Sequence, residues 1–318
     1  GGARLARAAE FVDPLDSPAA PSALAPRALL TAVARAGARL VVTPELSLCG
    51  YPPEDLVLRP AFLDACAREL VALADSVGQT AVIVGCPERD GGRGHNALAV
   101  LRAGRVTHVY RKQRLPNYTV FDEERYFDPG HAPCVADVDG LPVGLLICED
   151  IWYEQGPARV QALAGAEIII TINASPYHKG KGKERMQMLA QRAKENNVFV
   201  VYTNTVGGQD ELVFDGHSMI LDPKGKLLIA GKQFEEEMIT FDIRIPGPPR
   251  RGADITSELI LDEHRDFIDA VVISDRPAAE KNPLPPSHAV KPYSMSEEVY
   301  RALVLGTRDY VRKNRFKA

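Results

Sequence analysis

LPVGLLIC at residues 141–148 and AEIIITIN at residues 166–173 are two short apolar runs, and a stretch of helical character at 155–164 lies between them. Runs of this length and composition predict buried strands and are too short for membrane spans. A strand, a helix and a second strand in this order favour the α/β class.

The same alternation continues in both directions from this unit. It predicts helices at 27–37, 59–77, 155–164, 183–196 and 294–314, strands at 38–43, 80–86, 141–148, 166–173, 197–204 and 235–243, and hairpins at 96–111 and 216–231. Strands that alternate with helices and are interrupted by hairpins indicate a layered α/β domain with mixed sheets.

Four segments differ in composition. Residues 1–26 form an atypical proline- and alanine-rich stretch that predicts turns or extended chain, and 27–245 hold the main domain. Residues 246–293, with prolines concentrated in 276–292, are typical of a linker. In 294–318, Ser294 or Ser296 is suited to cap a helix whose apolar positions are Val299, Leu303, Val304 and Val311. A helix beyond a linker with nothing to pack on predicts that the chain is cut from something longer.

Composition excludes several classes of protein. The 38 basic and 42 acidic residues give a net charge of −4, which argues against nucleic-acid binding driven by bulk charge. No apolar run is long enough for a membrane span, and the first residues lack a signal-peptide core. Five cysteines without a C-x-x-C pair indicate reduced thiols in a cytoplasmic enzyme. The seven histidines show no metal-binding spacing, so we expect no metal site.

Three residues with chemical potential follow predicted strands. Cys148 ends the strand at 141–148, Glu45 follows the strand at 38–43, and Lys112 follows the second strand of the first hairpin. Strand ends face the rim of a sheet, where α/β enzymes build their sites. A cysteine nucleophile needs a base or a cation; Glu45 is suited to move a proton, and Lys112 to stabilise an oxyanion. Glu123 is suited to orient Lys112 or to receive a substrate amine.

Each residue alone has a simpler interpretation. Cys148 alone is most simply a buried structural thiol, and Glu45 a turn residue that caps the next helix. Lys112 alone is a solvated lysine, and Glu123 a surface acid in the cluster FDEER. Only the combination of glutamate, lysine and cysteine at successive strand ends favours catalysis.

This combination resembles the nitrilase, or carbon–nitrogen hydrolase, superfamily. Four longer stretches resemble the glutaminase domains of glutamine-dependent NAD synthetases within it: PELSLCGYPPEDL (44–56), RKQRLPNYTVFDEERYF (111–127), LICEDIW (146–152) and INASPYHKGK (172–181). The resemblance covers roughly residues 38–316. It implies an αββα four-layer sandwich for the domain at 27–245.

The resemblance also implies roles for individual residues. Glu45 would be the general base, Lys112 the oxyanion stabiliser and Cys148 the nucleophile that forms a thioester with L-glutamine and releases ammonia. Contacts to glutamine map onto Tyr118, Glu123, Ser175 and, less firmly, Lys181, where some members have arginine.

The resemblance implies partners as well. A synthetase domain would use the ammonia, with ATP and Mg²⁺, to amidate nicotinic acid adenine dinucleotide, and the enzyme would be a homo-oligomer. That domain's Ser-Gly-Gly-x-Asp-Ser loop does not occur in this sequence. We therefore expect the helix at 294–318 to be the first of a missing synthetase domain, and no cofactor in this chain. The family's first strand is not recognisable in 1–26 and is expected to be missing or altered.

Two alternatives remain open at this point. One is a stand-alone carbon–nitrogen hydrolase that acts on another small amide. The other is a catalytically silent module that serves in docking or oligomerisation.

Overall fold

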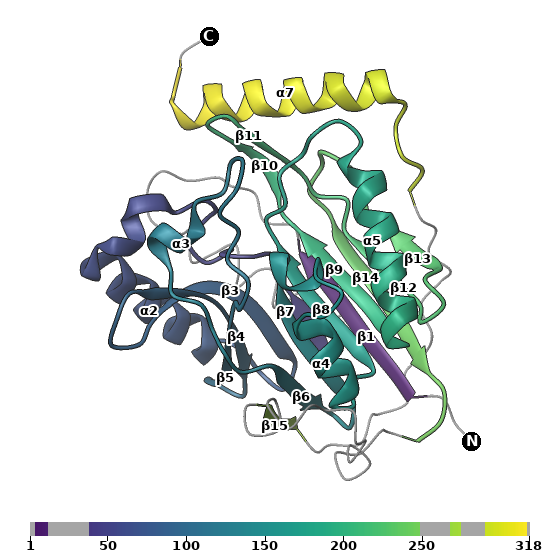
Figure 1. Cartoon of the computed structure of the whole chain (residues 1–318). Coiled ribbons are helices and arrows are strands. Elements are labelled where there is room, and N and C mark those ends of the chain that lie inside the picture. Colours follow the sequence, from purple (N-terminus) through teal and green to yellow (C-terminus); the bar gives the residue numbers. More distant parts are fainter. Residues whose placement is uncertain (1–3, 12–37, 249–267, 275–289, 317–318) are drawn as a thin grey trace.

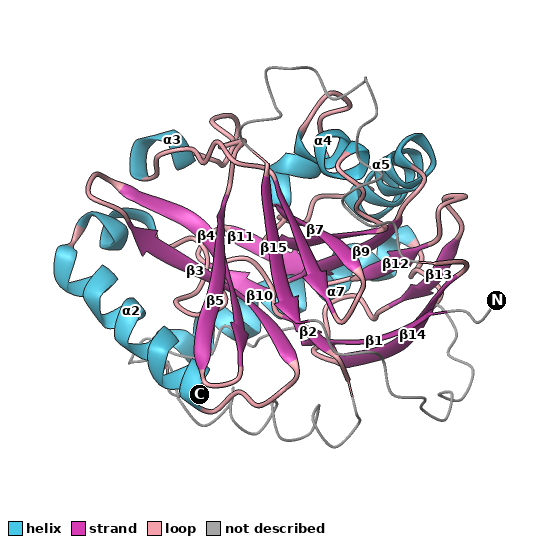
Figure 2. Cartoon of the chain, turned by 90° about the horizontal axis from the view of Figure 1, so that it is seen from below, coloured by secondary structure: helices cyan, strands magenta, loops and turns pink. Residues whose placement is uncertain are grey.

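The computed structural model of the chain (Figure 1) describes residues 4–11, 38–248, 268–274 and 290–316. The predicted helix at 27–37 and most of the proline-rich stretch at 276–292 lie outside these residues. Within the described part, two large sheets face one another, and helices lie on their outer sides (Figures 1 and 2).

The first sheet has six strands. Their spatial order is β14 (Met238–Ile245), β1 (Arg4–Phe11), β2 (Leu40–Val42), β3 (Ala81–Arg89), β4 (Gly94–Arg102) and β5 (Arg105–Arg111). β1, β2 and β3 run parallel, whereas β4 and β5 form the predicted antiparallel hairpin. This sheet positions the segments that follow β2 and β5.

The second sheet has seven strands. Their order is β13 (Leu227–Ala230), β12 (Met219–Leu221), β9 (Phe199–Asn204), β8 (Ile168–Asn173), β7 (Pro142–Ile147), β6 (Cys134–Val138) and β15 (Asp269–Ser274). β7, β8 and β9 are parallel, so their carboxyl ends meet at one edge of the sheet. The predicted hairpin at 216–231 is confirmed as β12 and β13.

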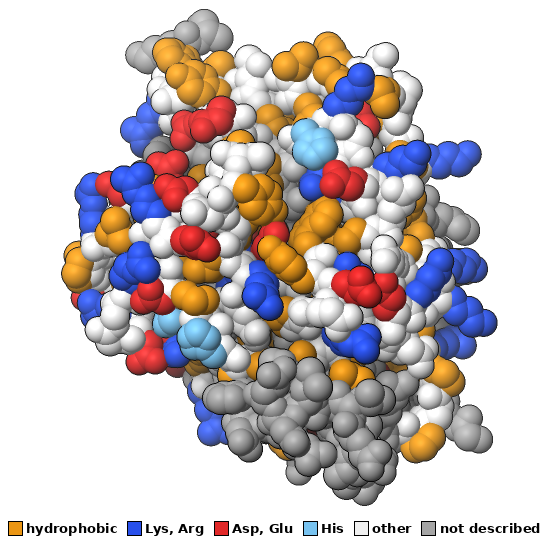
Figure 3. Space-filling view, viewed as in Figure 1, with side chains coloured by type: hydrophobic (Ala, Val, Ile, Leu, Met, Phe, Trp, Pro, Cys, Tyr) orange, Lys and Arg blue, Asp and Glu red, His pale blue; other side chains and the backbone are white. Residues whose placement is uncertain are grey.

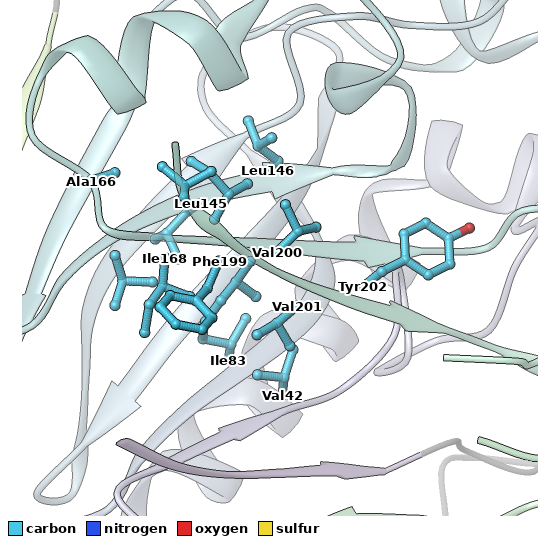
Figure 4. Packing of buried hydrophobic residues seen from close by; sticks show 14 of the residues in the cluster. Val42, Ile83, Leu145, Leu146, Ala166, Ile168, Phe199, Val200, Val201 and Tyr202 are labelled. Carbon is cyan, nitrogen blue, oxygen red and sulfur yellow. The ribbon is translucent and has the colours of Figure 1, made fainter. Parts of the chain in front are cut away.

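The main core lies between the two sheets. Figure 4 shows Val42 and Ile83 of the first sheet packed toward Val201 and its neighbours in the second. Side chains alternate along β3 because successive residues of a strand point to opposite faces. Ile83 therefore joins the core between the sheets, while Val82 and Val84 join a separate cluster on the outer face.

Helices cover the outer face of each sheet. α2 (Pro60–Asp75) buries Ala74 against the outer cluster of the first sheet. α4 (Pro157–Leu163) and α5 (Lys181–Asn196) cover the second sheet, with Leu189 of α5 fully buried (Figure 2). The expected αββα sandwich is therefore confirmed.

The first strand was expected to be missing or altered, and the expectation that it is missing is wrong. Arg4–Phe11 form β1, which lies between β2 and β14 in the first sheet. The local sequence hides this strand because both of its neighbours are distant: Ala8 pairs with Leu40 and with Phe241. Residues 12–26 of the same predicted segment lie outside the described residues.

The predicted linker at 246–293 also needs correction. Its residues Asp269–Ser274 form β15, which pairs in parallel with β6 at the edge of the second sheet. The domain therefore extends beyond residue 245. Sequence analysis also missed β6 and the hairpin of β10 (Val206–Gln209) and β11 (Leu212–Asp215), which are four or five residues long.

The last described helix is α7 (Met295–Lys313). Its N-terminal cap is Ser294, which is one of the two residues predicted for that role. The expectation that it has nothing to pack on is wrong, since it lies across β10 and β11 (Figure 1). Ala302 and Leu305 are its buried residues, and the predicted apolar positions Val299, Leu303, Val304 and Val311 are at least 37% exposed. Gly208 and Gly306 permit this contact, because a Cβ on Gly208 would lie 2.9 Å from the Cα of Gly306.

Acidic, basic and apolar side chains are interspersed on the face seen in Figure 3. Among the described residues, no helix is both long and apolar enough to cross a membrane.

Candidate active site

Glu45 lies in the turn that follows β2 and is 2% exposed. Its Oε2 accepts a hydrogen bond from the backbone N–H of Ala174, at 2.8 Å, which ties it to the carboxyl end of β8 in the other sheet. Its Oε1 accepts from Asn96 Nδ2 and from Lys112 Nζ, each at 2.7 Å. The carboxylate is therefore fixed across the gap between the two sheets and is not the helix cap of the simpler interpretation.

A glycine in β3 makes room for this turn. A Cβ on Gly85 would lie 2.4 Å from the backbone N of Leu46 and from the O of Pro44. Any side chain at this position would displace the turn that carries Glu45. The close approach therefore requires glycine.

Lys112 directly follows β5 and is 0% exposed, so it is not a solvated lysine. Its backbone is held on both sides: its N–H donates to the Asn96 carbonyl, and its carbonyl accepts from the Gly130 N–H. Its Nζ donates to Glu45 and, at 2.8 Å, to both carboxylate oxygens of Glu123. This ammonium group is consequently oriented by two buried carboxylates.

Cys148 directly follows β7 and begins the short helix η2 (Cys148–Ile151). Its φ of 44° lies in the left-handed region, which is strained for a residue with a side chain. The residue is 3% exposed and lies within electrostatic range of Glu45 and Lys112. The structure thus brings together the three residues that the sequence placed at separate strand ends.

Burial controls the protonation of this cluster. Burial and the Glu45 charge raise the pKa of the Cys148 thiol well above its usual range, although Lys112 opposes them. Burial lowers the pKa of Lys112, but the charges of Glu123 and Glu45 outweigh it and raise this pKa overall. At neutral pH the nucleophile is consequently a thiol that needs a base, and Lys112 remains a cation.

Glu123 is 5% exposed at the start of α3 (Glu123–Tyr126), so it is not a surface acid. Besides Lys112, its oxygens accept from the Tyr51 hydroxyl at 2.9 Å and from Asn96 Nδ2 at 3.3 Å. Burial raises the pKa of Glu123. These contacts favour its role in orienting Lys112, and its predicted contact with glutamine stays a prediction.

The other predicted substrate contacts differ in their exposure and in their partners. Tyr118 is half-exposed, and its hydroxyl donates to Glu149 at 2.9 Å. Ser175 is buried after β8, and its N–H donates to the Asn204 side chain. Lys181, at the start of α5, holds its Nζ 4.2 Å from the centre of the Trp152 ring. All three stay predictions as glutamine contacts.

Sequence analysis missed Asn96 and Glu149. Asn96 is fully buried in β4 and donates to both Glu45 and Glu123, so it keeps the two carboxylates in fixed positions. A lone polar residue at the start of the apolar run NALAVLR was its available signal. Glu149 follows the nucleophile, and burial raises its pKa. Its position beside Cys148 was visible, but its burial was not.

Comparison with known proteins agrees with this geometry. The carbon-nitrogen hydrolase family matches residues 15–247. The chain belongs to the carbon–nitrogen hydrolase family. Among the described residues of this carbon–nitrogen hydrolase, no cluster of three or more His, Cys, Asp or Glu side chains is suited to hold a metal ion.

Relatives with curated names extend this assignment. A glutamine-dependent NAD(+) synthetase of Aquifex aeolicus is 41% identical over 289 residues, which cover 87% of this carbon–nitrogen hydrolase and 49% of the relative. One of Thermotoga maritima is 41% identical over 300 residues, covering 88% and 49%. The chain therefore spans about half the length of the curated relatives it matches.

Solved structures give the same result for the fold. A glutamine-dependent NAD+ synthetase of Acinetobacter baumannii, in complex with adenosine diphosphate, superimposes with a TM-score of 0.74 at 29% identity. The match covers 97% of this carbon–nitrogen hydrolase and 52% of that chain.

Proposed function

We propose that the chain is the glutaminase portion of a glutamine-dependent NAD(+) synthetase. It would hydrolyse the side-chain amide of L-glutamine and supply ammonia to a synthetase domain, which would use ATP and Mg²⁺ to amidate deamido-NAD. The observation that carries the proposal is the fully buried contact of Lys112 with Glu45 and Glu123 beside Cys148. Buried charges of this kind are costly and are commonly kept for chemistry. They argue against a silent docking module.

The geometry supports a two-stage reaction. Glu45 takes the proton of the Cys148 thiol as the sulfur attacks the carboxamide carbon, which forms a C–S bond and places negative charge on the amide oxygen. Lys112 and the backbone N–H of Glu149 stabilise that oxygen, because N–H groups in the first turn of a helix have no acceptor within it.

Collapse of this intermediate breaks the C–N bond. Glu45 returns its proton to the departing nitrogen, which leaves as ammonia. The acyl group then remains bound to the Cys148 sulfur as a thioester. A water molecule then gives a proton to Glu45 and its oxygen to the acyl carbon. Cleavage of the C–S bond releases glutamate, and the proton on Glu45 returns to the Cys148 sulfur.

The choice of glutamine rests on the relatives and on the stretch at 111–127, which contains Lys112, Tyr118 and Glu123. In this proposal the glutaminase portion needs no cofactor. It is cytoplasmic, since all five cysteines are free thiols, and it forms homo-oligomers.

A panel of amides tests the proposal. We expect the purified chain to release ammonia from L-glutamine and much less from asparagine, acetamide or acrylamide. We also expect no NAD when ATP, Mg²⁺ and deamido-NAD are supplied, because amidation of a carboxylate requires activation by ATP in the synthetase domain. Ammonia from the other amides but not from glutamine would favour a stand-alone amidase, and NAD formation would contradict the division of labour proposed here.

A further inference from the structure

Asp150 is a fully buried carboxylate near Cys148 that the reaction described above does not use. Its Oδ2 accepts hydrogen bonds from the backbone N–H of Ile147 at 3.1 Å and from the Tyr110 hydroxyl at 2.8 Å. Its Oδ1 accepts from the backbone N–H groups of Gln113 at 3.1 Å and Arg114 at 2.8 Å. Four donors from three segments therefore converge on one side chain.

These donors come from both sheets. Ile147 is the last residue of β7 and immediately precedes Cys148, whereas Tyr110 lies in β5 of the first sheet. Gln113 and Arg114 are the two residues after Lys112. The carboxylate thus joins the turn that carries the nucleophile to the loop that carries the catalytic lysine.

The turn at Cys148 needs such support. A left-handed conformation is unfavourable for an L-residue, and it persists only where neighbouring contacts fix it. The hydrogen bond from the Ile147 N–H to the Asp150 side chain joins the residue before Cys148 to the residue two positions after it. Without it, the Cys148 backbone is free to relax toward an ordinary conformation, which moves the sulfur.

The buried surroundings of Asp150 disfavour its ionised form. Burial raises the pKa of Asp150 to about 6, even though the hydrogen bonds from Ile147, Arg114 and Tyr110 and the charge of Lys112 lower it. In the folded chain the ionised form is therefore less favourable than in the unfolded chain, and at neutral pH this ionisation opposes folding. Stability alone does not explain a carboxylate here.

We propose that Asp150 is a positioning residue that sets the distance and direction between the Cys148 sulfur and the Lys112 ammonium. This inference rests on the proposed function, since it assumes that both groups act on one amide. Asp150 touches neither the substrate nor the reacting atoms and acts only through the two segments that it joins.

The variant Asp150→Asn tests this role with almost no change in volume. An amide offers one acceptor oxygen and one NH₂ donor. The NH₂ group must therefore face either the Ile147 N–H and the Tyr110 hydroxyl or the N–H groups of Gln113 and Arg114, all of which are donors. The Tyr110 hydroxyl is able to reverse and accept, but a backbone N–H is not. At least one backbone bond to the side chain is therefore lost.

Two rates report on the position of the sulfur. We expect Asp150→Asn to lower kcat for glutamine by about 10²-fold with little change in KM, because a displacement of about 1 Å carries a cost of this size. We expect the rate constant for alkylation of Cys148 by iodoacetamide, followed by peptide mass spectrometry, to fall at least tenfold. A purely structural loss would instead lower the fraction of folded protein, which circular dichroism and a thermal melt would show.

Asp139→Asn is the matched control. Asp139 is a mostly buried aspartate in the turn after β6, and it pairs with Arg39 and Arg102 away from Cys148. We expect both rates of this variant to stay within about twofold of those of the parent chain. If folded Asp150→Asn behaves in the same way, or changes KM alone, the proposal is wrong.

A second variant keeps the test decisive if Asp150→Asn does not fold. Tyr110→Phe removes only the hydroxyl donor from β5 and should slow both kcat and alkylation about tenfold, the loss expected for one hydrogen bond to a charged acceptor. An unchanged alkylation rate in this variant would overturn the proposal. The alkylation assay needs no amide substrate, so a parent chain that fails to hydrolyse glutamine refutes the proposed function without deciding the role of Asp150.

Discussion

Replacement of Cys148 with alanine should abolish ammonia release from glutamine while the chain stays folded. The change removes one sulfur atom, and no hydrogen bond among the described residues depends on that atom. Because the first C–S bond cannot form, the expected loss is at least about 10⁴-fold, the scale seen when a covalent nucleophile is removed. Ammonia release with saturating glutamine measures the effect.

Cys86→Ala is the matched control for this variant. Cys86 is 1% exposed in β3, and burial raises the pKa of its thiol to about 12. The substitution removes the same atom from an equally buried site in the outer cluster of the first sheet. We expect activity close to that of the parent chain, apart from a small loss of stability. Equal losses in the two variants would mean that Cys148 is a structural thiol.

Replacement of Lys112 with arginine should cost about 10²–10³-fold in kcat, the effect of losing one oxyanion donor. Arginine keeps the positive charge, but its planar guanidinium group is larger and donates in fixed directions. The space around the Lys112 ammonium is enclosed by Glu45 and Glu123, each within 2.8 Å. Arginine therefore keeps the positive charge, but its N–H donors point in directions that differ from those of the lysine ammonium group.

Steady-state kinetics and a thermal melt separate catalysis from folding in this variant. Lys224→Arg is the control, since Lys224 is exposed at the turn of the β12–β13 hairpin. It should leave kcat unchanged. Turnover near that of the parent chain in Lys112→Arg would show that positive charge alone suffices and that the lysine geometry is not used.

Most of the fold was predictable because its longest elements carry their own signal. β3, β7, β8 and β9 are composed mainly of apolar residues, and α5 is bounded by residues that mark its ends. β1 and β15 were not predictable, since the partners that turn them into strands lie far away in the sequence. The contact of α7 was missed for a similar reason: it depends on two glycines that permit close approach, at positions 208 and 306.

The candidate site divides in the same way. Glu45, Lys112 and Cys148 were predictable because each follows a strand whose end is visible in the sequence. Asn96 and Asp150 were missed, since their importance comes from partners far away in the sequence. Asn96 donates to Glu45 within the first sheet, and Asp150 accepts from Tyr110 across the two sheets. Local sequence shows which residue ends a strand. It does not show which other strand end lies opposite that residue in the folded chain.

The covalent intermediate is the most direct test of the account. The parent chain would be mixed with isotopically labelled glutamine, quenched in acid during turnover, and digested for mass spectrometry of the peptide that carries Cys148. The account predicts a labelled glutamyl group on Cys148 as a thioester, which is absent from the other four cysteines and is removed by hydroxylamine. Glutamine hydrolysis that proceeds at full rate with no glutamyl group on Cys148 at any quench time, or with the group on another residue, would contradict it.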